Sequence, residues 1–291
     1  MNGKRKGVGV FIASACVSLL ILGGFLLLFM VYVKTAQAEA IRHDVTAEDL
    51  YHPEQSESLG LIVIGCDQAE DLPGLVQLIY YDAPAGTVFV VGIPPAAVCT
   101  LNSREDTLAG HYDYEGIRGT VNGVSKIIGF DADRYLRIQR KGISNLVDYL
   151  GGIPYDLPEP RMADGYEILP GPQLFDGRRT AALLFSGGNP DTEFQADLTF
   201  GLIQNGLNEK LGEKYDSFVQ AVFFNSESNL NQYDFVSRKR GLTGMLETGT
   251  LTVRKLTLSG TYSDDETKFY PDPESAASIA AELSGGISDS M

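Results

Sequence analysis

Asp67 is the residue most suited to chemistry in this sequence, because it follows a short apolar run directly. The run 59–64 is apolar, and Gly65, Cys66 and Asp67 come next. Open α/β sheets bind their ligands at the carboxyl ends of strands, so a carboxylate here could contact a ligand. An aspartate in such a turn more often caps the turn through its own side chain. Both alternatives remain open.

The cysteines and histidines do not form a metal-binding pattern. Cys16 lies in an apolar segment near the N-terminus, while Cys66 and Cys99 each follow a strand-like run. These two cysteines could form a disulfide in an exported domain or remain buried free thiols. The three histidines are scattered without metal-ligand spacing, so we expect no histidine-based metal site.

A second strand end, at residues 88–99 ("VFVVGIPPAAVC"), lacks any reactive group. The β-branched run 88–91 predicts a buried strand, and Pro94 and Pro95 must end it because proline has no N–H to donate to a sheet. Small apolar residues follow the prolines. We therefore expect an inert strand end at a place where α/β proteins often carry a functional group.

The sequence predicts that the elements which position these two strand ends form a mixed sheet with helices. Apolar runs predict strands at 59–64, and on both sides of a turn at 82–86. Ile143, Leu146, Val147 and Leu150 have helical spacing, residues 194–207 follow the same pattern, and a closing helix follows "YPDP". Residues 103–128 are polar and glycine-rich before helical periodicity returns. The expected fold class is α/β (α+β), a central mixed sheet flanked by helices.

The N-terminus predicts a membrane anchor. Residues 7–33 contain no charge, exceed the ~20 residues that cross a bilayer, and follow Lys4, Arg5 and Lys6. A cleaved signal peptide ending near "AQA" at 36–38, or acylation at Cys16, is the alternative. We expect a cytoplasmic tail (1–6), a transmembrane helix (7–33), a stalk (34–57), an extracytoplasmic domain (58–285) and a tail (286–291) in a single-pass membrane protein.

The charge of the chain excludes nucleic-acid binding. The formal net charge is −15, and three of the 23 basic residues lie at the extreme N-terminus. A nucleic-acid binder needs a basic surface to replace the counterions at phosphates. The acidic balance also argues mildly against direct binding of an anionic polymer.

Several stretches in order resemble the LytR-CpsA-Psr family, also called the cell envelope-related transcriptional attenuator domain. "LGLIVIGCDQ" resembles its first core strand and turn, with Asp67 at the aspartate position. "FDADRYLRIQRKGISNLVDYLGGIPYDLPEP" is the closest match, and "ILPGPQLFDGRRTAALLF" resembles a later hairpin and helix start. The similarity covers residues 59–283. It implies an extracytoplasmic phosphotransferase that moves glycopolymers from a polyprenyl pyrophosphate carrier to peptidoglycan, usually with Mg²⁺.

The polar positions that this resemblance implies are largely replaced here. Asp67 remains, whereas the family's arginines, aspartates and glutamine fall on other residue types. These degenerate positions are Gly74, Pro95, Ala96, Phe185, Gly187, Ala196 and Thr199. Substitute cations could come from Arg104, Arg118 and Lys126, in the polar segment that borders the site in the family, although solvated loop charges are the plainer interpretation. Arg178 and Arg179 indicate a solvated pair.

The sequence therefore leads to a catalytically degenerate family member that binds a polyprenyl lipid or regulates envelope-assembly proteins. We expect no catalytic residue, and no cofactor, with Mg²⁺ needed only if the family activity is retained. The alternatives are an active phosphotransferase with an altered set of cations and an anchored scaffold without a ligand.

Overall fold

A computed structural model describes residues 51–68, 71–185 and 191–288 of the chain, and His52–Met291 forms one compact unit. The predicted tail 1–6, transmembrane helix 7–33 and most of the stalk lie outside the described residues. Within them, no helix has the length and apolar character to cross a membrane.

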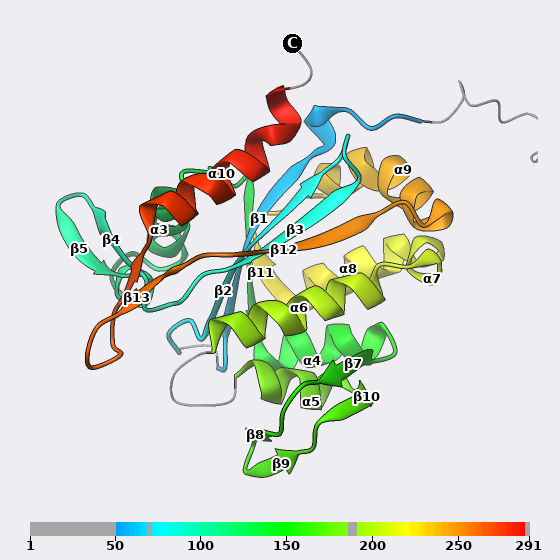
Figure 1. The fold of residues 1–291 in the computed structure, drawn as a ribbon. Coiled ribbons are helices and arrows are strands. Elements are labelled where there is room, and N and C mark those ends of the chain that lie inside the picture. Colours follow the sequence, from blue (N-terminus) through cyan, green and yellow to red (C-terminus); the bar gives the residue numbers. More distant parts are fainter. Residues whose placement is uncertain (1–50, 69–70, 186–190, 289–291) are drawn as a thin grey trace, which may run out of the picture. The chain divides into compact units, whose positions relative to one another are not determined.

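A six-stranded mixed sheet forms the centre, in the order β11-β6-β1-β2-β3-β12 (Figure 1). β1 pairs antiparallel with β2 and parallel with β6, and β3 pairs antiparallel with β2 and parallel with β12. The bounds are β1 Leu59–Cys66, β2 Leu75–Asp82, β3 Thr87–Gly92, β6 Arg134–Gln139, β11 Ser226–Ser228 and β12 Thr252–Thr257. The predicted mixed sheet and its central hairpin are confirmed.

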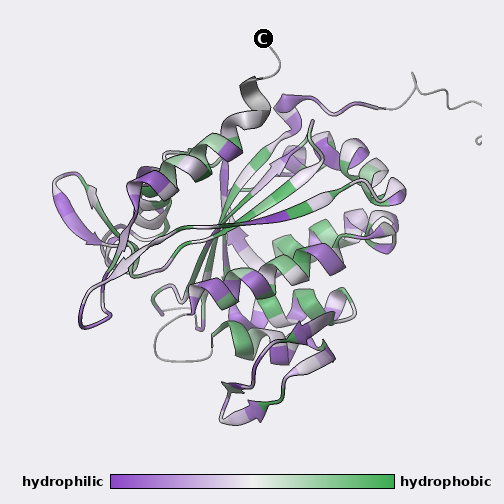
Figure 2. Ribbon diagram, in the orientation of Figure 1, coloured by the Kyte–Doolittle hydropathy of each residue, from purple (hydrophilic) through white to green (hydrophobic). Residues whose placement is uncertain are grey.

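Helices cover both faces of this sheet because its central strands are apolar on both sides. In β1, Ile62, Ile64 and Cys66 join one core cluster, whereas Leu61 and Val63 pack against another. α3 and α10 cover the first face, and α4, α5, α6 and α8 cover the second; apolar residues, green in Figure 2, occur both in the strands and in these helices. The helix bounds are α2 Leu108–Glu115, α3 Ile117–Ile128, α4 Arg140–Tyr149, α5 Gly177–Leu184, α6 Thr192–Gly206, α7 Glu209–Glu213, α8 Tyr215–Asn225, α9 Gln232–Thr248 and α10 Pro273–Ser288, after a 3-10 turn η2 Gln55–Glu57.

Smaller two-stranded sheets lie outside the central one. β7 (Ile153–Leu157) pairs with β10 (Gly171–Phe175). The chain between these two strands forms a hairpin of β8 (Arg161–Ala163) and β9 (Tyr166–Ile168). The remaining pairs are β4 (Val98–Leu101) with β5 (Arg104–Thr107), and β13 (Gly260–Tyr262) with β14 (Phe269–Pro271).

The polar segment 103–128 is more ordered than its composition indicates. It contains strand β5 and helices α2 and α3 rather than a loop. Its glycines permit close packing: a Cβ on Gly119 would lie 2.1 Å from the carbonyl oxygen of His111, and one on Gly123 would lie 2.4 Å from Leu108. Glycine content there reflects crowding between helices and not a flexible connection.

The strand at 88–92 ends where the prolines require. β3 ends at Gly92, and backbone groups beyond it still form hydrogen bonds. The carbonyl of Pro95 accepts a hydrogen bond from the N–H of Ala109, and that of Ala96 accepts one from Phe269. Both cysteines of the domain, Cys66 and Cys99, are buried free thiols, which answers the question that the sequence left open.

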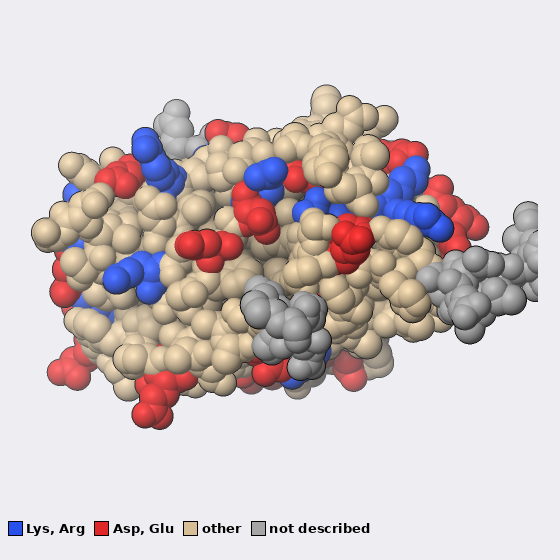
Figure 3. Space-filling model, turned by 90° about the horizontal axis from the view of Figure 1, so that it is seen from above, with Lys and Arg blue, Asp and Glu red and all other residues tan. Residues whose placement is uncertain are grey.

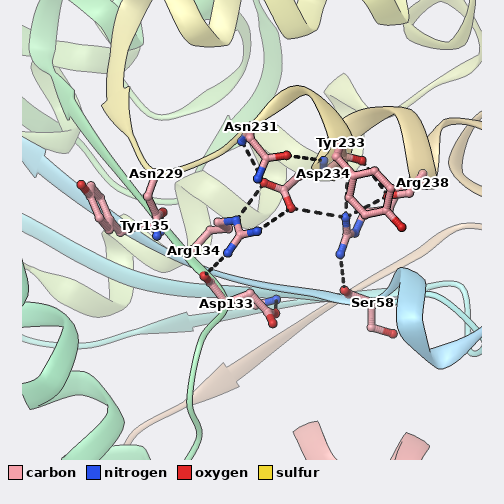
Figure 4. A network of polar contacts seen from close by, with 11 residues as sticks. Ser58, Asp133, Arg134, Tyr135, Asn229, Asn231, Tyr233, Asp234 and Arg238 are labelled. Atoms are coloured by element: carbon pink, nitrogen blue, oxygen red, sulfur yellow. Dashed lines mark hydrogen bonds and ion pairs between the residues drawn. The ribbon is translucent and has the colours of Figure 1, made fainter.

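A buried ion network fixes the other end of the sheet, where β1 and β6 begin (Figure 4). The Arg134 guanidinium donates to both carboxylate oxygens of Asp234, at 2.8 and 3.0 Å. Asp234 also closes the capping box of α9 with Asn231, and Arg238 donates to the carbonyl of Ser58 at 2.8 Å. This network joins α9 to the first residues of the central strands.

Candidate functional site

The carboxyl ends of four strands meet at one edge of the sheet. β1, β3, β6 and β12 run in the same direction, since β1 is parallel to β6 and β3 is parallel to β12, with β2 antiparallel between them. This edge is where α/β sheets place their ligands. It holds an ion cluster beside β1 and β6, and a groove beside β3 and β12.

The ion cluster centres on Arg140, which begins α4 directly after β6. Its Nη1 donates to Oδ1 of Asp67 at 3.2 Å, and its Nη2 donates to Oδ1 of Asp164 at 2.5 Å. Asp164 lies in the turn between β8 and β9. Burial alone would lower the pKa of Arg140, but the two carboxylates outweigh it and raise the pKa. The guanidinium is therefore permanently charged and is occupied by two carboxylates.

A second arginine, Arg137, lies in β6 beside the buried end of β1. Its Nε donates to the hydroxyl of Tyr112 at 2.7 Å, and its Nη1 lies 3.5 Å from Glu227. Burial raises the pKa of the Cys66 thiol, and the nearby charge of Arg137 only partly opposes this. Cys66 is thus a protonated thiol at neutral pH and not a nucleophile.

The groove at the end of β3 has a volume of about 620 Å³, and carboxylates outnumber cations along it. Gly92, Pro94, Thr192, Ala196, Lys255 and Tyr262 are among its lining residues. The Lys255 ammonium pairs with Asp197 and lies 3.8 Å from Glu193. Arg161, stacked on the ring of Phe194, pairs with Asp191 at 2.7 Å. Lys255, which lines this groove, and Arg161, which pairs with the lining residue Asp191, are both neutralised by neighbouring acids.

The ring of Phe185 lies against Gly65 and Gly74 at this edge, and we call this contact the aromatic partition. A Cβ on Gly65 would lie 3.1 Å from this ring, and one on Gly74 would lie 3.2 Å from it. Gln195 completes this partition, since its side-chain amide donates to the carbonyls of Gly74 and Leu184 at 2.8 and 2.7 Å. An aromatic ring therefore packs against the end of β1 and the residue before β2.

These residues do not fit a magnesium site. Mg²⁺ takes oxygen ligands, commonly one or two carboxylates together with substrate phosphates. Asp67 already accepts a hydrogen bond from Arg140, and the other carboxylate that contacts Arg140, Asp164, is occupied in the same way. Across the described ranges, no three His, Cys, Asp or Glu side chains come together as metal ligands.

Comparison with known proteins gives this arrangement a family. The LytR_cpsA_psr family matches residues 31–284. The chain belongs to this family. The teichoic acid transferase TagU of Bacillus subtilis, named as acting between polyisoprenyl-teichoic acid and peptidoglycan, is 21% identical over 300 residues, with 96% of each chain covered.

Solved structures share the LytR_cpsA_psr fold. A putative transcription regulator from Eubacterium siraeum matches with a TM-score of 0.71 at 16% identity, over 84% of this chain and 97% of that one. TagT bound to LI-WTA matches with a TM-score of 0.63 at 14% identity, again over 84% and 97%. The fold expected from the sequence is therefore confirmed.

The described positions at which the sequence analysis expects replaced family residues lie on segments at this same edge. Gly74 and Phe185 form the partition, and Ala196 lines the groove. Pro95 and Ala96 follow the lining residue Pro94 in the chain, and Thr199 lies one helical turn after Ala196. Ala196 packs against Gly92, where a Cβ would lie 2.9 Å from its methyl group. Gly187 lies outside the described residues.

The three predicted substitute cations lie elsewhere. Arg104 is in β5, pairs with Asp106 at 2.6 Å and stacks on Tyr114, while Arg118 and Lys126 are exposed residues of α3. Within the described segments, none of the three contacts Asp67 or lines the groove at β3. The interpretation of these residues as loop charges was wrong, because they belong to a strand and a helix. Their side chains are exposed to solvent, as that interpretation expected.

Sequence reasoning missed Arg137, Arg140, Arg161 and Lys255, the cations that do lie at this edge. A signal was available for Arg140, which follows the strand "YLRIQ" as Asp67 follows β1. A parallel neighbour brings both ends together. Nothing in the local sequence distinguishes Lys255 or Arg161 from surface charges.

Proposed function

We propose that this chain is a membrane-anchored, extracytoplasmic partner in the attachment of a wall glycopolymer to peptidoglycan, and that it binds or regulates without transferring the polymer. The named activity of TagU, together with membership of the same family, supports the process. The ion pairing at the sheet edge supports the absence of transfer.

That pairing is the observation that carries the proposal. A pyrophosphate carrier needs guanidinium forks that are free to bind its oxygens. Here Arg140 is held by Asp67 and Asp164, and Arg161 by Asp191 and Glu159. Loss of one transition-state charge contact already costs about 3–4 kcal/mol, or two to three decades in rate. Several of the family's contacts fall on Gly74, Ala96 and Ala196.

The test uses the full chain in lipid nanodiscs with a polyprenyl pyrophosphate-linked glycan, peptidoglycan and Mg²⁺. Native mass spectrometry records bound carrier, and mass spectrometry of the extracted lipids records the liberated polyprenyl phosphate. Binding without release is the expected result. Release that disappears in Asp67→Ala would overturn the proposal. If the chain shows no binding and no release, the lipid-binding part of the proposal is overturned and a scaffold remains.

One observation favours a second candidate, an active phosphotransferase with relocated cations. Arg137 lies in β6, and Arg140, the first residue of α4, directly follows this strand and donates to Asp67. In that reaction the acceptor hydroxyl would attack phosphorus, polyprenyl phosphate would leave, and a carboxylate would take the hydroxyl proton. Arg137→Gln and Arg140→Gln distinguish this candidate, because they would abolish release only if these arginines hold the carrier.

A further inference from the structure

The outer edge of β12 carries backbone groups that no other strand uses. β12 is the last strand of the central sheet, and only its inner edge pairs, with β3 (Figure 1). The N–H of Thr252 donates to the carbonyl of Gly86 at 2.8 Å, on the β3 side. Because backbone groups alternate between the two edges of a strand, residues 253, 255 and 257 turn theirs outward. No strand among the described residues pairs with them.

The groove at the end of β3 runs along this outer edge. One wall is the continuous stretch 255–260, from the end of β12 to the start of β13, and the first turn of α6 forms another. The hydroxyl of Ser275 ends the open part of the edge, because it donates to the carbonyl of Thr257 and accepts from the N–H of Ser259. A groove bordered by an open strand edge fits an extended peptide, which pairs through its main chain.

The lysine of this edge strand does not cover it, although lysine commonly protects exposed edges. Lys255 turns to the α6 face, where its ammonium pairs with Asp197 and lies 3.8 Å from Glu193. On the opposite face, Arg254 pairs with Glu282 of α10 at 2.5 Å. Both cations are therefore held against helices on the two faces of the sheet, and the main-chain edge between them stays open.

The charge of the groove is negative. Asp191, Glu193 and Glu266 line it, and Lys255 is the one basic residue among its lining residues in the described part of the chain. The Glu193 side chain is 71% exposed. Burial raises the pKa of Tyr262, and the charges of Asp191 and Glu266 raise this pKa further. A ligand that carries positive charge complements such a groove.

The cations beside the groove do not cancel this charge. Arg161 is shared between Asp191 and Glu159, just as Lys255 is shared between two carboxylates of α6. The turn 263–268, between β13 and β14, holds more acidic than basic residues. Carboxylates therefore remain in excess around the groove.

We propose that this groove binds an extended, basic peptide segment of a partner protein, which adds a strand to the outer edge of β12. The main chain of the peptide pairs with the outward backbone groups of Lys255 and Thr257, and its basic side chains lie beside Glu193 and Glu266. The inference rests on the proposed function and deepens it, because it names the kind of partner that a binding, non-transferring chain recruits.

The test uses the full chain in nanodiscs of phosphatidylcholine and a fluorescein-labelled hexapeptide of alternating lysine and valine. Fluorescence anisotropy measures the dissociation constant, and empty nanodiscs measure binding of the peptide to lipid. Two further peptides carry N-methyl groups on the lysines or on the valines. A fourth peptide has glutamine in place of every lysine.

We expect only one of the two N-methylated peptides to lose affinity, because the amides of alternate residues face the β12 edge. The loss should be about tenfold for each hydrogen bond removed. The glutamine peptide should bind about tenfold more weakly than the lysine peptide. Equal affinity of the two N-methylated peptides, full binding of the glutamine peptide, or no binding of the lysine peptide would overturn the proposal.

A substitution at Thr257 tests the backbone contact in the chain itself. Thr257→Pro removes an outward N–H and leaves the hydrogen bonds to β3 in place, so the lysine peptide should bind about tenfold more weakly. Thr257→Ala is the matched control, because it keeps this N–H, and its affinity should stay close to that of the unaltered chain. The same affinity in both variants would contradict strand addition.

The charge contact is tested by Glu193→Gln with Glu266→Gln. This double variant should weaken binding of the lysine peptide, whereas Asp113→Asn with Glu247→Gln, at exposed positions outside the groove, should not. An equal loss in both double variants would show attraction to the overall charge and overturn the site. Thermal melts by circular dichroism confirm that each variant is folded. No carrier or polymer is present, so failure of this inference is distinct from failure of the proposed function.

Discussion

Arg140 donates to Asp67 over 3.2 Å, although the two residues lie 73 positions apart in the sequence. The parallel pairing of β6 with β1 brings their carboxyl ends to the same edge. Asp67 therefore has a partner that is itself a candidate phosphate ligand. The Asp67 carboxylate and the Arg140 guanidinium neutralise each other, and Lys255 and Asp197 form a similar ion pair. On the face seen from above, basic side chains likewise lie beside acidic ones (Figure 3).

Removing the two carboxylates that occupy Arg140 should create an anion site. In the double variant Asp67→Asn, Asp164→Asn, the guanidinium keeps its charge but loses both ionic partners. We expect the affinity for inorganic pyrophosphate, measured by isothermal titration calorimetry, to rise about tenfold, equivalent to about 1.4 kcal/mol.

The control for this variant is Asp113→Asn, Glu247→Gln, which changes the net charge equally at two exposed positions. An equal gain in the control would show that the effect is only a change in overall charge. Adding Arg140→Gln to the first double variant should remove the gain.

Gly65→Ala should destabilise the domain at the partition. A Cβ there would lie 2.9 Å from Cβ of Leu75 and 3.1 Å from the ring of Phe185, so the buried neighbours must move. We expect the free energy of unfolding to fall by about 1–3 kcal/mol, measured by urea denaturation.

Gly244→Ala is the matched control, because nothing lies within 4 Å of its Cβ and it is an interior residue of α9. Alanine there should raise the free energy of unfolding by up to about 1 kcal/mol, through helix propensity. If Gly65→Ala proves as harmless as the control, the aromatic partition is looser than the structure shows.

Asp234 should make the stability of the domain depend on acid pH. Burial raises the pKa of this carboxyl, but hydrogen bonds from Arg134 and from the Asn231 N–H, with the charges of Arg134 and Arg238, outweigh burial and lower the pKa. Its contribution is complete above the ordinary pKa of about 3.9 and is lost as the pH falls through the lower, folded-state pKa.

Asp234→Asn should therefore lower the free energy of unfolding by about 3 kcal/mol at pH 7, and by less at pH 3. Urea denaturation at the two pH values measures the difference. A loss of the same size at both would contradict an ionised Asp234 in the folded protein. Asp113→Asn, at an exposed position, should change the stability little at either pH.

Cys66 and Cys99 should resist thiol reagents in the folded domain. Burial, helped by the charge of Asp106, raises the pKa of Cys99 to about 11, so at pH 8 only about one thiol in a thousand is ionised. We expect alkylation by iodoacetamide, followed by peptide mass spectrometry, to reach both residues only in denaturant. Rapid labelling without denaturant, or a disulfide-linked peptide from a non-reduced sample, would refute this.

The central sheet follows from local sequence. The apolar runs of β1, β2 and β3 predict strands, and the prolines after Ile93 predict where β3 ends, because these are properties of neighbouring residues and of single backbone units. The segment 103–128 was misjudged, because the glycines that lower its helix propensity are the ones that let α2 and α3 pack closely.

The candidate site, in contrast, was decided by tertiary structure. Asp67 stood out because it follows a strand, but its partners Arg140 and Asp164 come from another strand end and from a hairpin turn. The sequence does not show whether a charged side chain faces water or a carboxylate. Only the parallel register of β1 with β6, and the position of the hairpin against α5, determine which charges meet and which, like Arg178 and Arg179, stay unpaired among the described residues.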